Sequence, residues 1–282
     1  YADPLPRPEA GLRVFHLGHS LVGQDMPVML RQLAEAGGFE THAFASQVGW
    51  GTPLRTHWDP EIEIPGLETV KDGDDWGDAR EAIVSGAYDA VVLTEMVEIK
   101  DAIRYHESAK YFAQWADLAR EAAPGTRIYL YETWHWVNDP AGWVERLEGD
   151  RGPHWENGIL LPDLARNPDR PAHVIPAGTV MARFTRALEE RGGVEGIAAP
   201  EDLFGLDPEG KPDPIHMGDL GNYLVALTHY AVLYQRSPVG LPYRLTKADG
   251  SPAVAPSAEA ARLMQEVVWD TVTSDPKTGV GT

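Results

Sequence analysis

Ser20 follows an apolar run near the start of the chain, in the stretch VFHLGHSLVG at positions 14 to 23. Much later, Asp213 stands three residues before His216 in a segment rich in Pro and Gly. A serine hydroxyl is a weak nucleophile until a base takes its proton, and the base works best when a carboxylate fixes its tautomer. An Asp and a His on one tight loop can supply both parts, so these residues indicate nucleophilic catalysis.

The position of Ser20 also allows a simpler role. The turn from Leu17 to Ser20 is predicted to join a strand to a helix, whose free N–H groups and positive dipole end favour an oxyanion. Serine is equally a preferred N-cap residue. Position alone leaves both the nucleophile and the cap open.

The elements that must position these residues follow an α/β pattern. Short apolar runs alternate with longer stretches of helical period, which is typical of parallel strands joined by crossover helices. Strands are predicted at residues 13–17, 41–46, 89–93, 127–131 and 173–175. Helices are predicted at residues 27–36, 75–85, 108–122, 179–191, 220–235 and 257–273, with glycines near several of their ends. Ligands bind such a sheet outside the carboxyl ends of its strands, where Ser20 follows the first one.

Two long segments depart from this alternation. Residues 51–73 are rich in Pro, Glu and Asp, and residues 134–171 carry four tryptophans and many charges. Neither segment shows a repeat or the composition of a flexible linker. We therefore expect one domain, residues 1–282, with both segments as excursions above the sheet.

The composition excludes several classes of function. Lys and Arg total 24 against 43 Asp and Glu, a formal net charge of −19, and such a surface repels nucleic acid and anionic lipid. The chain has no cysteine, so disulfides, thiolate metal sites and a cysteine nucleophile are excluded. The longest apolar stretch, residues 224–234, is too short to span a bilayer, so no membrane insertion is expected. The chain opens Tyr-Ala-Asp without an initiator methionine, from which we expect a removed leader and a secreted or periplasmic protein.

Taken together, LGHSL near the N-terminus and DPIHMGDLGNYL near the C-terminus resemble the SGNH hydrolase superfamily, the GDSL-type esterases and lipases, and most of all its carbohydrate-active branches. The resemblance implies a flavodoxin-like three-layer α/β/α sandwich with a mainly parallel five-stranded sheet. It implies that Ser20 is the nucleophile, His216 the general base and Asp213 the carboxylate that orients it. Members typically cleave O-acyl esters without a metal or organic cofactor, which predicts a small-molecule or carbohydrate ester as substrate.

The resemblance also implies an oxyanion hole, and here the sequence departs from the family. The stretch SQVGWGTPL offers Gly49 and Gly51 as backbone donors; the family spacing favours Gly49, alongside the N–H of Ser20. The family usually presents an asparagine donor after the third strand, but this chain reads VVLTEMVEIK, with Glu95 near that position. Losing one such donor costs on the order of 10²–10³ in rate. Either the hole has backbone donors alone, or another side chain replaces the asparagine, or ester hydrolysis has weakened.

Several residues near the predicted site could contact a substrate. Trp134 and His135 follow the fourth strand in YLYETWHWVNDP, where flat apolar faces beside hydrogen-bonding groups suit pyranose rings. Trp50, His19 and Glu95 are further candidates. The alternatives are that the tryptophans pack in the core, that His19 is a plain turn residue and that Glu95 is a solvated loop residue.

Two other functions compete with a serine esterase. A metal-dependent hydrolase would need convergence among His16, His19, His135, His154, Asp213 and His216, but no HExxH motif is present. An acyltransferase or carbohydrate-binding relative would explain the missing asparagine. The presence of Ser20, Asp213 and His216 together favours the esterase: removal of a small acyl group, such as acetyl, from a carbohydrate, with no cofactor.

Overall fold

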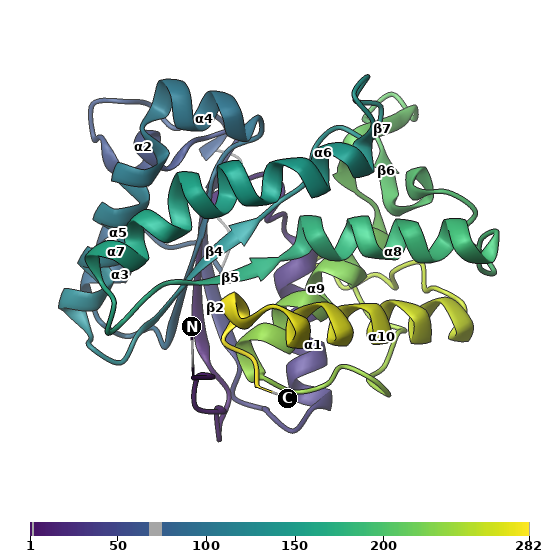
Figure 1. The fold of residues 1–282 in the computed structure, drawn as a ribbon. Helices are drawn as coiled ribbons and strands as arrows, with labels where there is room; N and C mark the ends of the chain where they lie inside the picture. The colour runs from purple at the N-terminus through teal and green to yellow at the C-terminus, as the bar shows by residue number, and fades with distance from the viewer. Residues whose placement is uncertain (2, 68–74, 282) are drawn as a thin grey trace.

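The computed structural model describes residues 1, 3–67 and 75–281 and contains the predicted α/β fold (Figure 1). Five parallel strands lie in the order β2-β1-β3-β4-β5. Their bounds are Arg13–His19 for β1, Ala43–Gly49 for β2, Ala90–Thr94 for β3, Arg127–Glu132 for β4 and His173–Pro176 for β5. All five predicted strands are confirmed, and this order is that of a flavodoxin-like doubly wound sheet.

Helices cover both faces of the sheet, as side-chain alternation along buried strands requires. Val14 and Val92 point into one core, with α1 (Asp25–Ala36), α8 (Ala177–Arg191), α9 (Asp219–Tyr234) and α10 (Ala258–Ser274). Phe15, Leu17 and Val91 point into the other, with α3 (Ala79–Val84) and α5 (Ser108–Ala122) among its helices. The predicted helices are thus present, although the one predicted at 75–85 begins only at Ala79, where the Asp78 side chain caps it.

The segment predicted as an excursion at 134–171 is largely helical. It forms α6 (Trp143–Asp150), a π-helix (Arg151–Leu160) and α7 (Leu161–Arg166). Trp155, Ile159 and Leu160 pack into the core beside α5, so this segment completes a helical layer instead of projecting above the sheet. The Pro and Gly residues of this segment are unfavourable in helices, so the sequence pattern did not predict its helices.

Smaller elements complete the described fold. The segment at 51–73 contains α2 (Leu54–Trp58), and its residues 68–73 lie outside the described residues. α4 (Ile99–His106) follows β3, and 3-10 turns occupy Pro200–Leu203 and Pro276–Thr278. A second sheet pairs β6 (Phe204–Leu206) with β7 (Pro212–Met217) in antiparallel fashion. Within residues 1, 3–67 and 75–281, no helix combines the length and apolar character needed to cross a bilayer.

A buried ion pair joins the helical layer to the sheet. The Arg120 guanidinium on α5 donates to both carboxylate oxygens of Asp163 on α7, at 2.8 and 2.7 Å, and both side chains are almost fully buried. Asp163 also accepts from the backbone N–H of Ala172, just before β5. One carboxylate therefore holds α5, α7 and the start of β5 together.

Replacing Asp163 with alanine should lower the free energy of unfolding by about 3 kcal/mol, because the almost fully buried Arg120 loses both hydrogen bonds to this carboxylate and keeps only Asp117 Oδ1, at 3.1 Å, as an ionic partner. Urea unfolding followed by circular dichroism measures this loss. Arg166→Ala is the matched control, since that ion pair with Asp117 involves a 63% exposed arginine and should contribute no more than about 1 kcal/mol. Equal losses in the two variants would contradict the assignment.

Candidate active site

Ser20 lies directly beyond the carboxyl end of β1, at the edge where parallel strands present ligands. Gly18 is required in this strand, because a Cβ there would lie 2.4 Å from the Cβ of Thr94 on β3. The N-cap position of α1 belongs to Gln24, not to Ser20, so the alternative role of Ser20 as a helix cap is wrong. The serine hydroxyl is therefore free for another partner.

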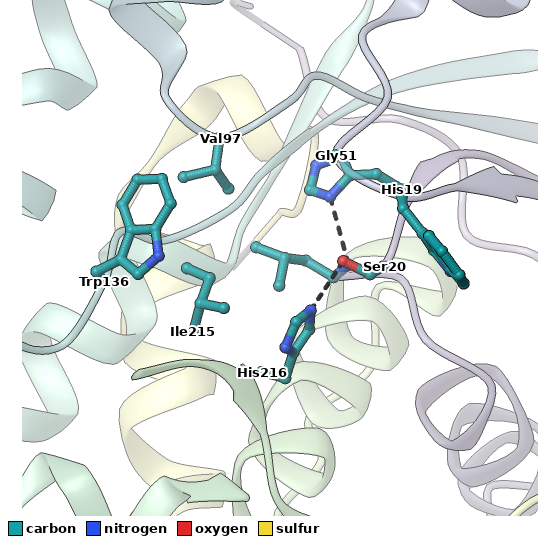
Figure 2. Close-up of a pocket in the computed structure, with 9 residues that line it drawn as sticks. His19, Ser20, Gly51, Val97, Trp136, Ile215 and His216 are labelled. Atoms are coloured by element: carbon teal, nitrogen blue, oxygen red, sulfur yellow. Dashed lines mark hydrogen bonds between the residues drawn. The ribbon is translucent and has the colours of Figure 1, made fainter. Parts of the chain in front are cut away.

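That partner is His216, which stands 196 residues away in sequence. The His216 Nε2 atom lies 3.0 Å from Ser20 Oγ (Figure 2). Its Nδ1 atom lies 2.8 Å from Asp213 Oδ2. An imidazole that donates from Nδ1 to the carboxylate keeps the Nε2 lone pair facing the serine hydroxyl. The structure brings the three predicted catalytic residues together in one chain of hydrogen bonds.

The segment that carries Asp213 and His216 is a strand and not the tight loop expected from its prolines. Within β7, Asp213 Oδ1 accepts hydrogen bonds from the backbone N–H groups of Ile215 and His216, both at 2.8 Å. Partial burial would raise the pKa of the Asp213 carboxyl, but these N–H groups and the imidazole outweigh it and lower the pKa below its usual value. Asp213 is thereby kept ionised, as an orienting carboxylate must be.

Residues after β4 fix β7 in place. The Trp134 indole N–H donates to the Ile215 carbonyl at 2.7 Å, and the Val137 N–H donates to the Pro214 carbonyl at 2.8 Å. Trp134 is 2% exposed and does not line the pocket, so its contact is with the strand that carries the base. The sequence marked this tryptophan as a substrate contact, whereas its position makes it a support for His216.

A pocket of about 410 Å³ opens beside the serine and histidine (Figure 2). Its walls are mostly apolar and combine residues from the turns after β1, β2, β3 and β4 and from β7: His19, Ser20, Leu21, Trp50, Gly51, Val97, Trp136, Ile215 and His216. Trp50 and Trp136 are exposed and present large flat surfaces. Trp50 and His19 were predicted contacts, while Val97 and Ile215 carry no signal in the sequence that distinguishes them from core residues.

Gly51, not the favoured Gly49, contributes to the pocket wall. Gly49 is the last residue of β2 and pairs in register with His19, and a Cβ on it would lie 2.2 Å from Thr52 Oγ1. Gly51 has a φ of +56°, and its N–H donates to no acceptor among the described residues. Gly51 therefore borders the pocket, and the role of Gly49 as an oxyanion donor stays a prediction.

Glu95 points away from the pocket. Its side chain is fully buried, and Oε1 accepts from the backbone N–H groups of Met96 and Leu54 at 2.8 and 3.3 Å. Burial raises the pKa of this carboxyl to about 7, although hydrogen bonds pull it down. Val97 stands in the pocket wall after β3, and no carboxamide side chain lines the pocket among the described residues.

Two neutral histidines hold the turn that carries Ser20. Burial lowers the pKa of both His19 and His57 to about 4. His19 Nε2 donates to the Glu95 carbonyl at 2.8 Å, and His57 Nε2 donates to the Gly18 carbonyl at 2.7 Å. His57 is a supporting residue that the sequence analysis missed, since a lone histidine in a polar segment carries no positional signal.

His135 lies outside the pocket, in a group of charged residues behind it. Glu98, His135 and Asp150 offer ligand atoms close enough to hold a metal ion. Arg146 already contacts Glu98 at 2.5 Å and Asp150 at 2.9 Å, and Lys100 contacts Asp150 at 3.0 Å. Protein cations thus neutralise these carboxylates, and the donor set does not fit a metal ion. The other predicted ligands, His16, His19, His154, Asp213 and His216, do not join this group.

Comparison with known proteins connects the geometry to known folds. No protein-family model matches the sequence, and no curated protein matches it. The chain is similar in structure to a DUF4886 family protein from Bacteroides uniformis, with a TM-score of 0.55, 16% identity and coverage of 93% of this chain and 95% of that one. At this identity the similarity establishes the fold alone.

Ester hydrolases are among the more distant structural neighbours. A protein proposed to be an SGNH hydrolase, from Slackia heliotrinireducens, gives a TM-score of 0.44 at 20% identity, covering 78% of this chain and 97% of that one. A carbohydrate esterase of family 3 from Talaromyces cellulolyticus gives 0.42 at 13% identity, covering 79% and 97%.

Replacing Trp134 with phenylalanine should slow the reaction of Ser20 with a fluorophosphonate about three- to tenfold, because it removes one hydrogen bond that holds β7. The labelling rate, followed by intact mass, measures this effect. Trp115→Phe is the matched control, since its indole bonds to the Leu54 carbonyl in the helical layer. A labelling rate that is the same in both variants would refute a positioning role for Trp134.

Replacing Glu95 with glutamine should stabilise the protein above about pH 7. The folded-state pKa of Glu95 is raised from 4.5 to about 7, so its contribution to stability is present below 4.5 and is lost as the pH rises through 7. The free energy of unfolding of the glutamine variant should therefore exceed that of the parent by about 3 kcal/mol at pH 8 and match it near pH 4. Urea unfolding across this range measures the difference, and a pH-independent difference would contradict it.

Proposed function

We propose that this protein is a serine ester hydrolase that uses Ser20, His216 and Asp213. The observation that carries the proposal is the hydrogen-bonded chain from Asp213 through His216 to Ser20 at the wall of an apolar pocket. A cluster that only stabilises the fold does not require a half-exposed histidine hydrogen-bonded to both a serine and a carboxylate. The same arrangement activates serine on unrelated folds.

In this mechanism Ser20 Oγ attacks the carbonyl carbon of the ester while His216 Nε2 takes the hydroxyl proton. The imidazolium, stabilised by Asp213, then gives that proton to the departing alcohol, which leaves an acyl group on Ser20. Water enters with His216 again acting as base and releases the acid. Backbone N–H groups would stabilise the oxyanion. The N–H of Ser20 is one of them, and Gly51, which borders the pocket, is a stronger candidate than Gly49 for the second.

The pocket favours an ester with an apolar group. Leu21, Val97 and Ile215 offer no hydrogen bonds, and the volume of about 410 Å³ lies in the range of roughly 300–1,000 Å³ usual for small-molecule sites. Removal of a small acyl group from a carbohydrate remains a prediction, supported by the flat faces of Trp50 and Trp136. Two residues that were expected to make polar contacts with the carbohydrate, Glu95 and His135, are buried and do not line the pocket.

A serine-directed fluorophosphonate tests the proposal. One adduct should form on Ser20, and both labelling and ester hydrolysis should fall by at least about 10³-fold in Ser20→Ala and His216→Ala. Asp213→Asn should cost roughly 10- to 100-fold less than either of these two variants. The exposed Ser237 gives the matched control, Ser237→Ala, which should behave as the parent. No adduct in a folded protein would refute the proposal.

Substrate panels then separate the finer possibilities. p-Nitrophenyl esters of increasing acyl length and acetylated monosaccharides report which side of the ester the pocket accepts. Adding a sugar acceptor and measuring acyl transfer against release of free acid tests the acyltransferase alternative, which gains support because none of the described pocket residues carries a carboxamide. Preferential transfer to the acceptor would replace hydrolysis as the proposed activity.

A further inference from the structure

Arg146 is the centre of an ion-pair network directly behind the pocket. Its guanidinium donates to Glu98 Oε2 at 2.5 Å, to Asp139 Oδ2 at 2.8 Å and to Asp150 Oδ2 at 2.9 Å. The Arg146 side chain is only 14% exposed, and its three partners are 7–21% exposed. At this burial the attraction between the charges is screened far less than in an exposed pair.

Two of these carboxylates adjoin the far wall of the pocket. Glu98 follows Val97 directly in the segment after β3, and Val97 lines the pocket. Asp139 closes the turn after β4, since its N–H donates to the carbonyl of Trp136 at 3.0 Å, and Trp136 is another part of the same wall. In the view of Figure 2, Val97 and Trp136 both lie to the left of Ser20.

The Arg146 network differs from the exposed ion pairs that join helices at a protein surface. Exposed pairs are the usual form of ion pairing between helices, and Arg186 on α8 makes such pairs with Glu145 and Glu148 on α6. Arg146 instead joins two loops that share no strand pairing at this point. His135 completes the set as a neutral side chain, because burial lowers its pKa, and its Nε2 lies 3.0 Å from Asp150.

We propose that Arg146 is a positioning residue that fixes the separation of Val97 and Trp136 and thereby sets which apolar groups the ester pocket accepts. The inference rests on the proposed esterase function and names the determinant of its specificity. At roughly 30 Å³ for each water-sized group, the pocket has room for about a dozen heavy atoms. An acetyl group would fill only a small part of this volume, whereas a medium-length acyl chain or an aromatic group would contact both Val97 and Trp136.

The apolar group could belong to the acyl or to the alcohol side of the ester. Two series distinguish these sources: p-nitrophenyl esters from acetate to octanoate vary the acyl group, and acetate esters of linear alcohols vary the alcohol. In the series that enters the pocket, each buried methylene should raise kcat/KM by up to about fourfold. The ratio of the longest to the shortest ester in that series is the specificity that Arg146 should control.

Two single variants each weaken one arm of the network and keep the local turn. Glu98→Gln retains an acceptor for the Lys100 N–H, and Asp139→Asn retains one for the Ala141 N–H. Each should lower the long-to-short ratio about three- to tenfold. The double variant should lower it no further than the stronger single one, because both act through Arg146. Arg146→Met should lower the ratio about as far as the double variant, and Arg146→Lys should restore part of it. Glu148→Gln on the same helix is the matched control.

Binding gives a second readout that does not depend on turnover. In the Ser20→Ala background, quenching of tryptophan fluorescence by p-nitrophenyl octanoate measures affinity, which should fall about three- to tenfold in Glu98→Gln and not in Glu148→Gln. A uniform fall for short and long esters, an unchanged ratio, or unchanged octanoate affinity would each overturn the role of Arg146. Failure of the parent to label at Ser20 would instead refute the esterase, and the binding experiment would still decide the inference.

Discussion

The hydrogen bond between Ser20 and His216 is the contact on which the site depends, because its two residues have separate supports. Ser20 is carried by β1, which is buried on both faces and lies between β2 and β3 in the sheet. His216 is carried by a short strand of a separate two-stranded sheet, which the 134–137 segment attaches to the main fold. A small shift of either support would separate the proposed base from the proposed nucleophile, and proton transfer between them tolerates a change in distance of only a few tenths of an ångström.

The molecule combines an acidic surface with an interior in which buried carboxylates such as Asp163 are paired with cations and buried histidines are neutral. Its net charge of −19 lies mostly on exposed carboxylates, yet the buried carboxylates Asp163 and Asp150 are matched by arginine or lysine. Buried histidines follow the other solution and stay neutral, since burial disfavours the charged form. The region around Ser20 therefore contains His19 and His57 as fixed hydrogen-bond donors and keeps ionic groups out of the pocket wall.

The pocket differs from the sequence-based expectation in a consistent way. Glu95, Trp134 and His135 were chosen because they are polar or aromatic and follow strands at the right edge. Each turned inward to meet a backbone or ionic partner, since polar groups that leave solvent need such partners. The wall includes Val97 and Ile215, whose apolar side chains need no partner, and the exposed Trp136, an aromatic residue that the sequence also placed after β4. A site built this way recognises shape more than hydrogen-bonding groups.

The sequence by itself determined the five strands, the α/β class and the three residues Ser20, Asp213 and His216. The strands were predicted from local periodicity, and the three residues from their chemistry and from the resemblance of the two end motifs to SGNH hydrolases. Only the tertiary structure decided that Gly51 and not Gly49 borders the pocket, that residues 143–166 are helical, and that Arg146 lies behind Val97 and Trp136. These facts depend on which loops meet at one edge of the sheet, and that meeting is set by packing between segments distant in sequence.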